Sequence, residues 1–281
     1  MPLTRMDTLL AEARAKGYAV GAFECWNSDN IHGIARAAAE TGCPVIFQAS
    51  PAEYGLMGGP DVLKAIVDTY VHKYNVTAAL HLDHGSTIEH VRECLAAGFT
   101  SVMLDASTLP YRENCDLARE TCRLAHAQDV SVEAELGHVG GAAEGGVAAE
   151  SALTVPDEAA RFVAESGVDC LAVAIGTVHG DYRGKPELRL ARLQEIASRV
   201  SAPLVLHGGS GTPPDQLAKA IALGIAKINI CTEIDKTYIA AVKEAELHLT
   251  PSVPGNYYKP AVAAVAAHVA RLIRQFRGEA K

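Results

Sequence analysis

The stretch Leu80-His81-Leu82-Asp83-His84-Gly85 determines how the rest of this sequence is interpreted. It ends an apolar run that starts at Val76, and such a run predicts a buried strand. Buried charged groups are costly unless they are paired or bind a metal, so two imidazoles and a carboxylate at this position indicate a functional site. Ser86 and Glu89 then have the spacing of a helix capping box, which places the polar residues at a strand-to-helix corner.

Two further apolar runs end in the same way. Residues 171–180 finish with His179-Gly180, and residues 204–211 pass through His207 into Gly208-Gly209-Ser210-Gly211. A single histidine at a strand end is more often structural than a metal ligand. Three of them, each followed by glycine after a buried run, predict a metal site made of three imidazoles.

Composition narrows the class of protein. The 281 residues are 49% hydrophobic, which is enough for one large core, and α/β barrels commonly have this length. The net charge of −8 opposes nucleic-acid binding, which usually needs a basic face. The sequence shows neither an apolar signal region nor a run of ~18 apolar residues, so we expect no membrane partner. The seven cysteines lack C-x-x-C spacing, which predicts reduced core thiols in a cytoplasmic protein and no cysteine-ligated zinc.

Strand and helix patterns alternate along the chain. The predicted strands are short and mostly apolar on both faces, as in parallel sheets, and cover residues 18–23, 44–49, 76–80, 101–105, 130–135, 170–175, 203–206 and 226–230. Helices are predicted over residues 7–16, 28–40, 86–98, 112–128, 157–166, 190–199, 233–249 and 259–277, with two more that begin at 60 and 212. This alternation favours a single-domain (β/α)8 TIM barrel over residues 1–281 with extra C-terminal helices. An open doubly wound sheet is the alternative, but no G-x-G-x-x-G follows the first strand.

In such a barrel the active site lies at the carboxyl ends of the strands. Polar residues occur at nearly all of these ends and not at the strand starts: Glu24, Asn27, Gln48, Ser50, Asp83, His84, Asp105, Ser107, Glu133, Glu135, His179, His207, Asn229 and Thr232. The fold prediction therefore gathers them at one rim. Residues 208–211 after the seventh strand and 229–232 after the eighth lie where these barrels often bind phosphate.

Several polar residues also have a structural interpretation. His81 and His84 are three residues apart, so their side chains are expected on opposite faces of the strand. We therefore interpret His81 as structural. Glu133 and Glu135 share a strand face, and the alternative to a functional role is an ion pair with a lysine or arginine. The single tryptophan, Trp26, either fills the core or covers the substrate.

With these residues placed, the chain resembles the class II ketose-bisphosphate aldolases, the zinc-dependent family of fructose- and tagatose-bisphosphate aldolases. The matching segments run in the family's order from about residue 20 to 235 and include Leu80-His-Leu-Asp-His-Gly85, Val132-Glu-Ala-Glu-Leu-Gly137 with Gly140-Gly141, Ala174-Ile-Gly-Thr-Val-His-Gly180, Leu206-His-Gly-Gly-Ser-Gly211 and Lys227-Ile-Asn-Ile-Cys-Thr-Glu233.

The resemblance implies a role for each segment. Asp83 would act as acid and base at the aldehyde-side hydroxyl, and catalytic zinc would be bound by His84, His179 and His207. Glu135 and Asp105 would lie near the metal, as alternative ligands or at a second divalent site. A phosphorylated sugar would be held through its dihydroxyacetone phosphate half by Gly180, Gly208, Gly209, Ser210, Asn229, Ile230, Cys231 and Thr232, with Ser50 and Asn27 also at the substrate. The family further implies a monovalent cation, Na+ or K+, near these loops and a homodimer or homotetramer.

The chemistry of the residues agrees with this reaction. Cleavage of a ketose bisphosphate leaves an enediolate on the three-carbon fragment, and zinc stabilises that charge as a Lewis acid. Neutral imidazoles leave the ion its positive charge and an open position. No Schiff base is needed, although Lys227 makes a Schiff-base aldolase a distant alternative.

Two departures from the family bear on the substrate. The family carries an acidic pair after Gly140-Gly141, with a glutamate that exchanges a proton, whereas this chain has Ala142-Ala143, and Glu144 is the candidate after a one-residue shift. Glu24 stands where the family usually has asparagine, and a carboxylate there repels phosphate but can bind hydroxyl groups.

These departures leave three rivals open: an aldolase for a ketose 1-phosphate that lacks the second phosphate, a metal-dependent epimerase, and a non-catalytic sugar-phosphate binding protein. In the family a late arginine can reach a second phosphate, and the candidates here are Arg271, Arg274 and Arg277.

Overall fold

Eight parallel strands close into a barrel and follow one another around it in chain order. The computed structural model describes residues 3–141, 149–182, 184, 186–248 and 253–279. The strands are β1 (Val20–Glu24), β2 (Val45–Ala49), β3 (Ala78–Gly85), β4 (Ser101–Leu104), β5 (Ser131–Leu136), β6 (Cys170–Val173), β7 (Leu204–Leu206) and β8 (Ile225–Ile230). Since β8 also pairs with β1, the sheet has no open edge. The predicted (β/α)8 barrel is confirmed, and the open doubly wound sheet is excluded.

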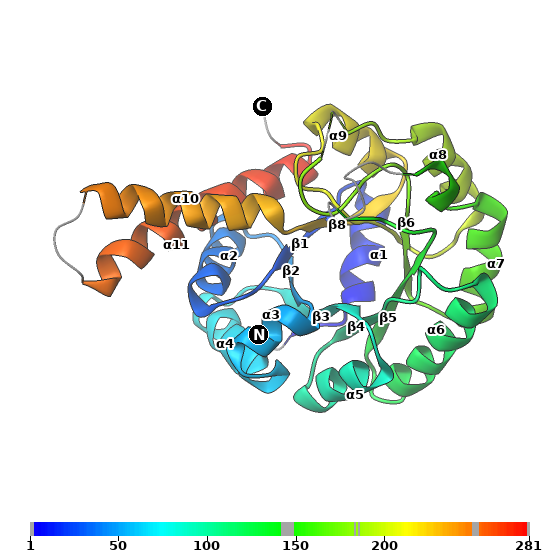
Figure 1. Ribbon diagram of the computed structural model, residues 1–281, viewed down its shortest axis with the longest axis horizontal. Helices are drawn as coiled ribbons and strands as arrows, with labels where there is room; N and C mark the ends of the chain where they lie inside the picture. The colour runs from blue at the N-terminus through cyan, green and yellow to red at the C-terminus, as the bar shows by residue number, and fades with distance from the viewer. Residues whose placement is uncertain (1–2, 142–148, 183, 185, 249–252, 280–281) are drawn as a thin grey trace.

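Helices surround this barrel (Figure 1). They are α1 (Met6–Lys16), α2 (Ser28–Thr41), α3 (Pro51–Met57), α4 (Pro60–Tyr74), α5 (Ile88–Ala97), α6 (Tyr111–His126), α7 (Pro156–Ser166), α8 (Leu190–Arg199), α9 (Pro214–Ala222), α10 (Thr232–His248) and α11 (Pro254–Phe276), with a short 3-10 helix η2 (Glu150–Ala152). Helix α1 closes the amino-terminal end of the barrel, where Met6 and Leu10 pack with Val20 and Val205. Helices α10 and α11 pack on each other and extend beyond the barrel as an arm (Figure 1). Within the described ranges, none of the helices has the length and apolar character to span a membrane.

One short helix was not predicted, and two predictions about helix starts are wrong. The capping box is at Ser50 and Glu53, where it opens α3, a helix whose seven residues are too few to show a clear period. Ser86 is not a cap, because the Thr87 side chain caps α5 instead. Helix α11 begins at Pro254 rather than at residue 259, since a proline in the first turn has no N–H group to satisfy.

The inner face of the barrel has two layers of side chains. The layer at the amino-terminal ends of the strands is apolar and consists of Val20, Ala22, Ile46, Ala79, Ala172 and Val205. The next layer is polar and fully buried, and it consists of Gln48, His81, Glu133 and Lys227. Because side chains alternate along a strand, each inward position lies two residues from the next, and the polar layer therefore lies directly beneath the residues at the mouth. His81 belongs to this layer, with its Nδ1 atom 2.8 Å from Ser101 Oγ, which agrees with the predicted structural role.

All seven cysteines are free, and six of them are buried, as predicted for core thiols. Cys231 is the exception, because it lines the cavity described below.

Candidate active site

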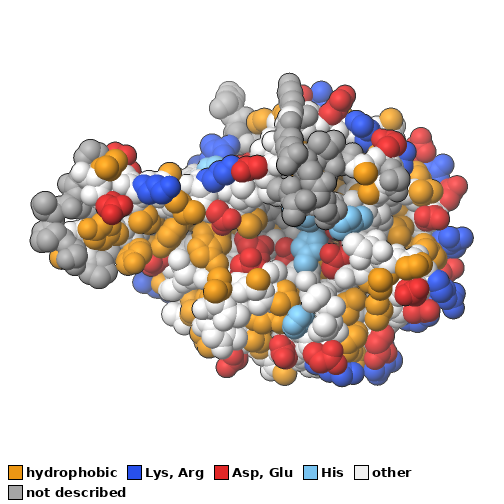
Figure 2. All heavy atoms as spheres, in the orientation of Figure 1, with side chains coloured by type: hydrophobic (Ala, Val, Ile, Leu, Met, Phe, Trp, Pro, Cys, Tyr) orange, Lys and Arg blue, Asp and Glu red, His pale blue; other side chains and the backbone are white. Residues whose placement is uncertain are grey.

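Three histidines meet at the carboxyl-terminal mouth of the barrel. Figure 2 shows histidine and acidic side chains gathered near the centre of this face. His84 lies at the end of β3, whereas His179 follows β6 and His207 follows β7. One nitrogen atom from each ring lies within 4.8 Å of the nitrogen atoms from the other two. The predicted cluster of imidazoles therefore forms.

The remaining nitrogen of each ring is held by an acceptor. His84 Nδ1 donates to Asp105 at 2.7 Å, and His179 Nδ1 donates to the Val139 carbonyl at 3.0 Å. His207 Nε2 donates to Glu133 at 2.7 Å. Such contacts fix the tautomer and the orientation of metal-binding imidazoles. The second nitrogen atom of each ring, which does not take part in these hydrogen bonds, faces the other two rings.

These facing atoms fit a metal ion. Since the other nitrogen of each ring carries the proton, neutral His84 and His207 direct lone pairs at each other, with His84 Nε2 only 2.9 Å from His207 Nδ1. His179 Nε2 is buried and has no hydrogen-bond partner among the described residues. Burial alone would lower the pKa of His84, but Asp83, Asp105 and Glu135 raise it to about 10, so the surroundings favour a positive charge here. Burial and the neighbouring His84 and His207 lower the pKa of His179 to about 3, which keeps this ring a neutral donor.

His84 reaches the cluster through an unusual backbone conformation. Its φ angle is +45°, in the left-handed region that few non-glycine residues adopt, and the register between β3 and β4 shifts between Leu82 and Gly85. The strand therefore stops alternating after Asp83, so that Asp83 and His84 both face the mouth. The next residue must be glycine, because a Cβ atom at Gly85 would lie 2.7 Å from the Met103 carbonyl oxygen.

A buried ion pair supports His207 from below. Lys227 Nζ lies 2.8 Å from the Glu133 carboxylate, and both side chains are completely buried. Burial by itself would raise the pKa of Glu133, but Lys227 and His207 hold it well below its usual range. The sequence left the role of Glu133 open, and the structure shows that it pairs with a lysine and also orients His207. Lys227 is committed to this pair and does not line the cavity at the mouth.

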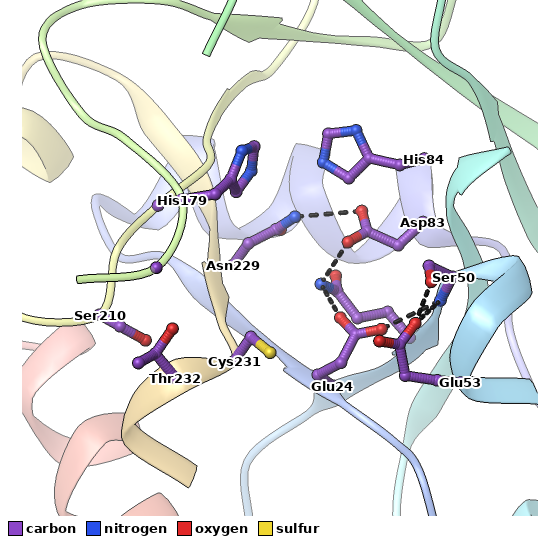
Figure 3. A pocket seen from close by; sticks show the side chains of 13 residues that line it. Glu24, Ser50, Glu53, Asp83, His84, His179, Ser210, Asn229, Cys231 and Thr232 are labelled. Atoms are coloured by element: carbon purple, nitrogen blue, oxygen red, sulfur yellow. Dashed lines mark hydrogen bonds between the residues drawn. The ribbon is translucent and has the colours of Figure 1, made fainter. Parts of the chain in front are cut away.

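Two more carboxylates lie beside the histidines. Asp83 accepts hydrogen bonds from the side-chain amides of Gln48 at 3.0 Å and Asn229 at 3.2 Å (Figure 3). Burial would raise its pKa, but His84, His207 and Lys227 together lower it, so Asp83 is held as a carboxylate. Glu135 accepts from the Val139 backbone amide at 2.8 Å, and its Oε2 atom lies 3.4 Å from His207 Nδ1. Burial raises the pKa of Glu135.

His84, His179 and Asp83 open into a cavity of about 190 Å³, whereas His207 is fully buried and does not line it. Seven of the ten residues predicted at the substrate also line it, namely Ser50, Gly180, Gly208, Ser210, Asn229, Cys231 and Thr232. Three predicted residues do not: Asn27 caps α2, Ile230 is buried in the hydrophobic core, and Gly209 lies behind the wall. Ala142, Ala143 and Glu144 lie outside the described residues.

One side of the cavity is a glycine loop beside a helix start. Gly208 has φ +63°, and a Cβ atom there would lie 2.3 Å from the Val178 carbonyl oxygen. The side chain of Ser210 accepts from the backbone amide of Glu233 at 3.3 Å, which joins the loop to the first turn of α10. Backbone amides of a glycine loop and a helix start form a natural anion site, so this side suits a phosphate.

The structure adds two residues that the sequence did not single out as site residues. Gln48 and Glu53 both line the cavity. Gln48 was noted only as one polar strand end among many. Glu53 had a readable signal, because Ser50-x-x-Glu53 after a strand has capping-box spacing.

The candidate arginines for a second phosphate do not line the cavity within this chain. Arg271 lies 3.7 Å from Glu233, and Arg274 lies 2.7 Å from Glu40. Arg277 pairs with Glu279 at 3.0 Å and stacks on the Tyr18 ring.

Comparison with known proteins agrees with this geometry. The model of the family "Fructose-bisphosphate aldolase class-II" matches residues 4–281. A probable fructose-bisphosphate aldolase of Bacillus subtilis (strain 168) is 42% identical over 280 residues, and the match covers 98% of each chain. A fructose-bisphosphate aldolase of Staphylococcus epidermidis is 40% identical with the same coverage. The crystal structure of the YdjI aldolase from Escherichia coli K12 matches with a TM-score of 0.88 and 33% identity, over 100% of both chains.

Proposed function

This chain belongs to the family of class-II fructose-bisphosphate aldolases, and we propose that His84, His179 and His207 hold its catalytic zinc ion. The chain catalyses metal-dependent aldol cleavage of a ketose bisphosphate, the reaction of its family. The observation that carries the zinc proposal is the direction of the three rings. Each has one nitrogen bonded to an acceptor and the other turned toward the common centre.

Bound zinc supplies Lewis-acid polarisation of the carbonyl and hydroxyl oxygen atoms of the ketose. Asp105 and Glu133 would act on the rings that bind it, by holding His84 and His207 in the required tautomers. Glu135 Oε2 lies 3.4 Å from His207 Nδ1, which supports its proposed role as an alternative ligand.

Asp83 is the proposed acid and base. It lies at the mouth, and the amides of Gln48 and Asn229 fix both of its oxygen atoms. In the cleavage direction it takes the proton from the substrate hydroxyl that becomes the aldehyde oxygen. The adjacent C–C bond breaks, and its electron pair stays on the three-carbon fragment. That fragment takes up a proton and leaves as dihydroxyacetone phosphate. The residue proposed from the sequence for this second proton, Glu144, is outside the described residues.

The phosphate of this fragment is proposed to bind at the glycine loop. Gly180, Gly208, Ser210 and Thr232 line this side of the cavity, and Asn229 lies between them and Asp83 (Figure 3). In this orientation the other half of the ketose extends past Asp83 toward Glu24 and Glu53.

The test is release of dihydroxyacetone phosphate, coupled to its reduction, from fructose and tagatose 1,6-bisphosphates and their 1-phosphates. We expect release by zinc-loaded protein and none after chelation, with recovery on zinc addition. Asp83→Asn keeps the shape and removes the base, so we expect zinc to bind normally while turnover falls about 10²–10⁴-fold. Formation of an epimer without a triose would contradict aldol cleavage.

We also propose that the chain forms a homodimer or homotetramer through the arm of α10 and α11. Large apolar side chains are exposed on or beside this arm, at Ile239, Leu247, Val253 and Tyr258. Exposed apolar surface of this kind marks contact sites, and closed symmetric assemblies are the usual outcome. Sedimentation at the mass of a single 29.6 kDa chain would contradict this proposal.

A further inference from the structure

The wall of the cavity beside Asp83 is acidic. Glu24 at the end of β1 and Glu53 in the first turn of α3 both line it, and Figure 3 shows both beneath Asp83, away from Ser210 and Thr232. The backbone amide of Ser50 joins them, since it lies 3.0 Å from a Glu24 oxygen and 3.2 Å from a Glu53 oxygen. The carboxyl groups are therefore built into the site and are not mobile surface acids.

Gln48 shows which hydrogen bonds this wall offers. Its Nε2 atom lies 3.0 Å from Glu24 and 3.0 Å from Asp83. Since Asp83 is held as a carboxylate and can only accept a hydrogen bond, the nitrogen of the amide must face it. The amide oxygen of Gln48, Oε1, therefore remains available as an acceptor, and it is buried without a hydrogen-bond partner among the described residues. Together with the two glutamates, this oxygen makes the wall rich in acceptors.

The acidic wall continues outward. A neighbouring cavity of about 290 Å³ shares Glu24, Glu53 and Cys231 with the first and adds Asp235. Trp26 and Tyr238 line the same cavity, with their rings 6.1 Å apart and nearly perpendicular. Among the described residues that line either cavity there is no lysine or arginine. Acceptors beside aromatic rings match the hydroxyl and C–H faces of a sugar chain.

Electrostatics agrees with this geometry. Burial raises the pKa of Glu24 well above its usual range, and the nearby Asp83 and Glu53 raise it further. A protonated Glu24 offers a hydroxyl group that can both donate and accept a hydrogen bond, and the neighbouring Asp83 is held as a carboxylate. A phosphate dianion at this place would meet like charge in a partly buried setting, where screening by salt is weak.

We propose that Glu24 and Glu53 are specificity-determining residues that select a hydroxyl-bearing, uncharged aldehyde half and disfavour a second phosphate there. The proposal rests on the proposed function and refines its substrate class: ketose 1-phosphates with a polyol tail are better substrates than the corresponding 1,6-bisphosphates. Oxygen atoms of Glu24, Glu53 and Gln48 accept hydrogen bonds from hydroxyl groups of the tail.

The test compares substrates that differ only in the second phosphate. With zinc-loaded wild-type protein, kcat/KM is measured for fructose 1-phosphate and 1,6-bisphosphate, and for the same two esters of tagatose. In the condensation direction, glyceraldehyde is compared with glyceraldehyde 3-phosphate at saturating dihydroxyacetone phosphate. We expect the ratio of bisphosphate to 1-phosphate to be below one. In Glu24→Gln and Glu53→Gln, which keep the side-chain shape and remove an acidic group, we expect it to rise at least tenfold.

Glu93→Gln is the matched control, because it removes one charge from an exposed position of α5 and should leave the ratio unchanged. Zinc content and melting temperature show whether each variant is folded and loaded. Dihydroxyacetone phosphate release from any ester supports the proposed function independently of the ratio. A wild-type ratio above one, or a ratio that neither glutamate variant moves while turnover persists, overturns the specificity inference alone. No release from any ester overturns both.

Discussion

Replacement of Lys227 by methionine tests the buried ion pair beneath the active site. Lys227 Nζ lies 2.8 Å from the Glu133 carboxylate, and neither side chain is exposed to solvent. Removing one partner leaves an uncompensated buried charge, which costs about 3–5 kcal/mol. We therefore expect Lys227→Met to lower the free energy of unfolding of the metal-free protein by about 3–5 kcal/mol, as measured by urea denaturation.

The double variant Lys227→Met with Glu133→Leu separates stability from metal binding. It removes both charges and keeps a similar volume, so we expect its free energy of unfolding to return close to that of the wild type. It also removes the acceptor that His207 Nε2 uses at 2.7 Å. Loss of such an orienting contact weakens metal binding about 10–100-fold, which competition with a chromogenic chelator measures.

Two results would refute this reasoning. A Lys227→Met protein within about 0.5 kcal/mol of the wild type, the range of ordinary surface substitutions, would show that Glu133 carries no uncompensated charge. A double variant that is stable but binds zinc with wild-type affinity would show that Glu133 does not orient His207.

The remaining predictions concern single contacts. Asp105→Ala removes the acceptor of His84 Nδ1, so zinc affinity in chelator competition should fall about 10–100-fold, while Asp105→Asn, which keeps an acceptor, should lose less. Gly208→Ala places a Cβ atom 2.3 Å from a backbone oxygen at a φ of +63°, so the loop must shift, and KM for the ketose phosphate should rise with zinc content unchanged. Thr87→Ala should lower the free energy of unfolding by about 1 kcal/mol in urea titrations, whereas Ser86→Ala should change it less, because Thr87 is the observed cap of α5.

Much of the fold can be predicted because its signals are local. Each apolar run that forms a strand, and each helical period between two strands, is contained in one short segment of the chain. Parallel strands buried on both faces can be recognised from such apolar runs alone. Short or irregular features were harder. Helix α3 has only seven residues, and the φ angle of +45° at His84 comes from the register shift beside β4 rather than from its own residue type.

The residues of the site also differ in how well the sequence predicts them. His84, His179, His207 and Asp83 could be proposed as site residues from the chain alone, because each stands at the end of a buried apolar run where a polar group is costly without a function. Their supporting partners could not be identified in this way.

Glu133 meets Lys227 across a sequence separation of 94 residues, and Gln48 joins Glu24 to Asp83 across 24 and 35 residues. These partnerships exist only once the sheet closes and sets the register of distant strands, because a hydrogen bond depends on distance and direction in space. Residue types along the chain thus indicate which chemistry is present, whereas closure of the barrel selects which groups orient the three histidine rings and which line the cavity.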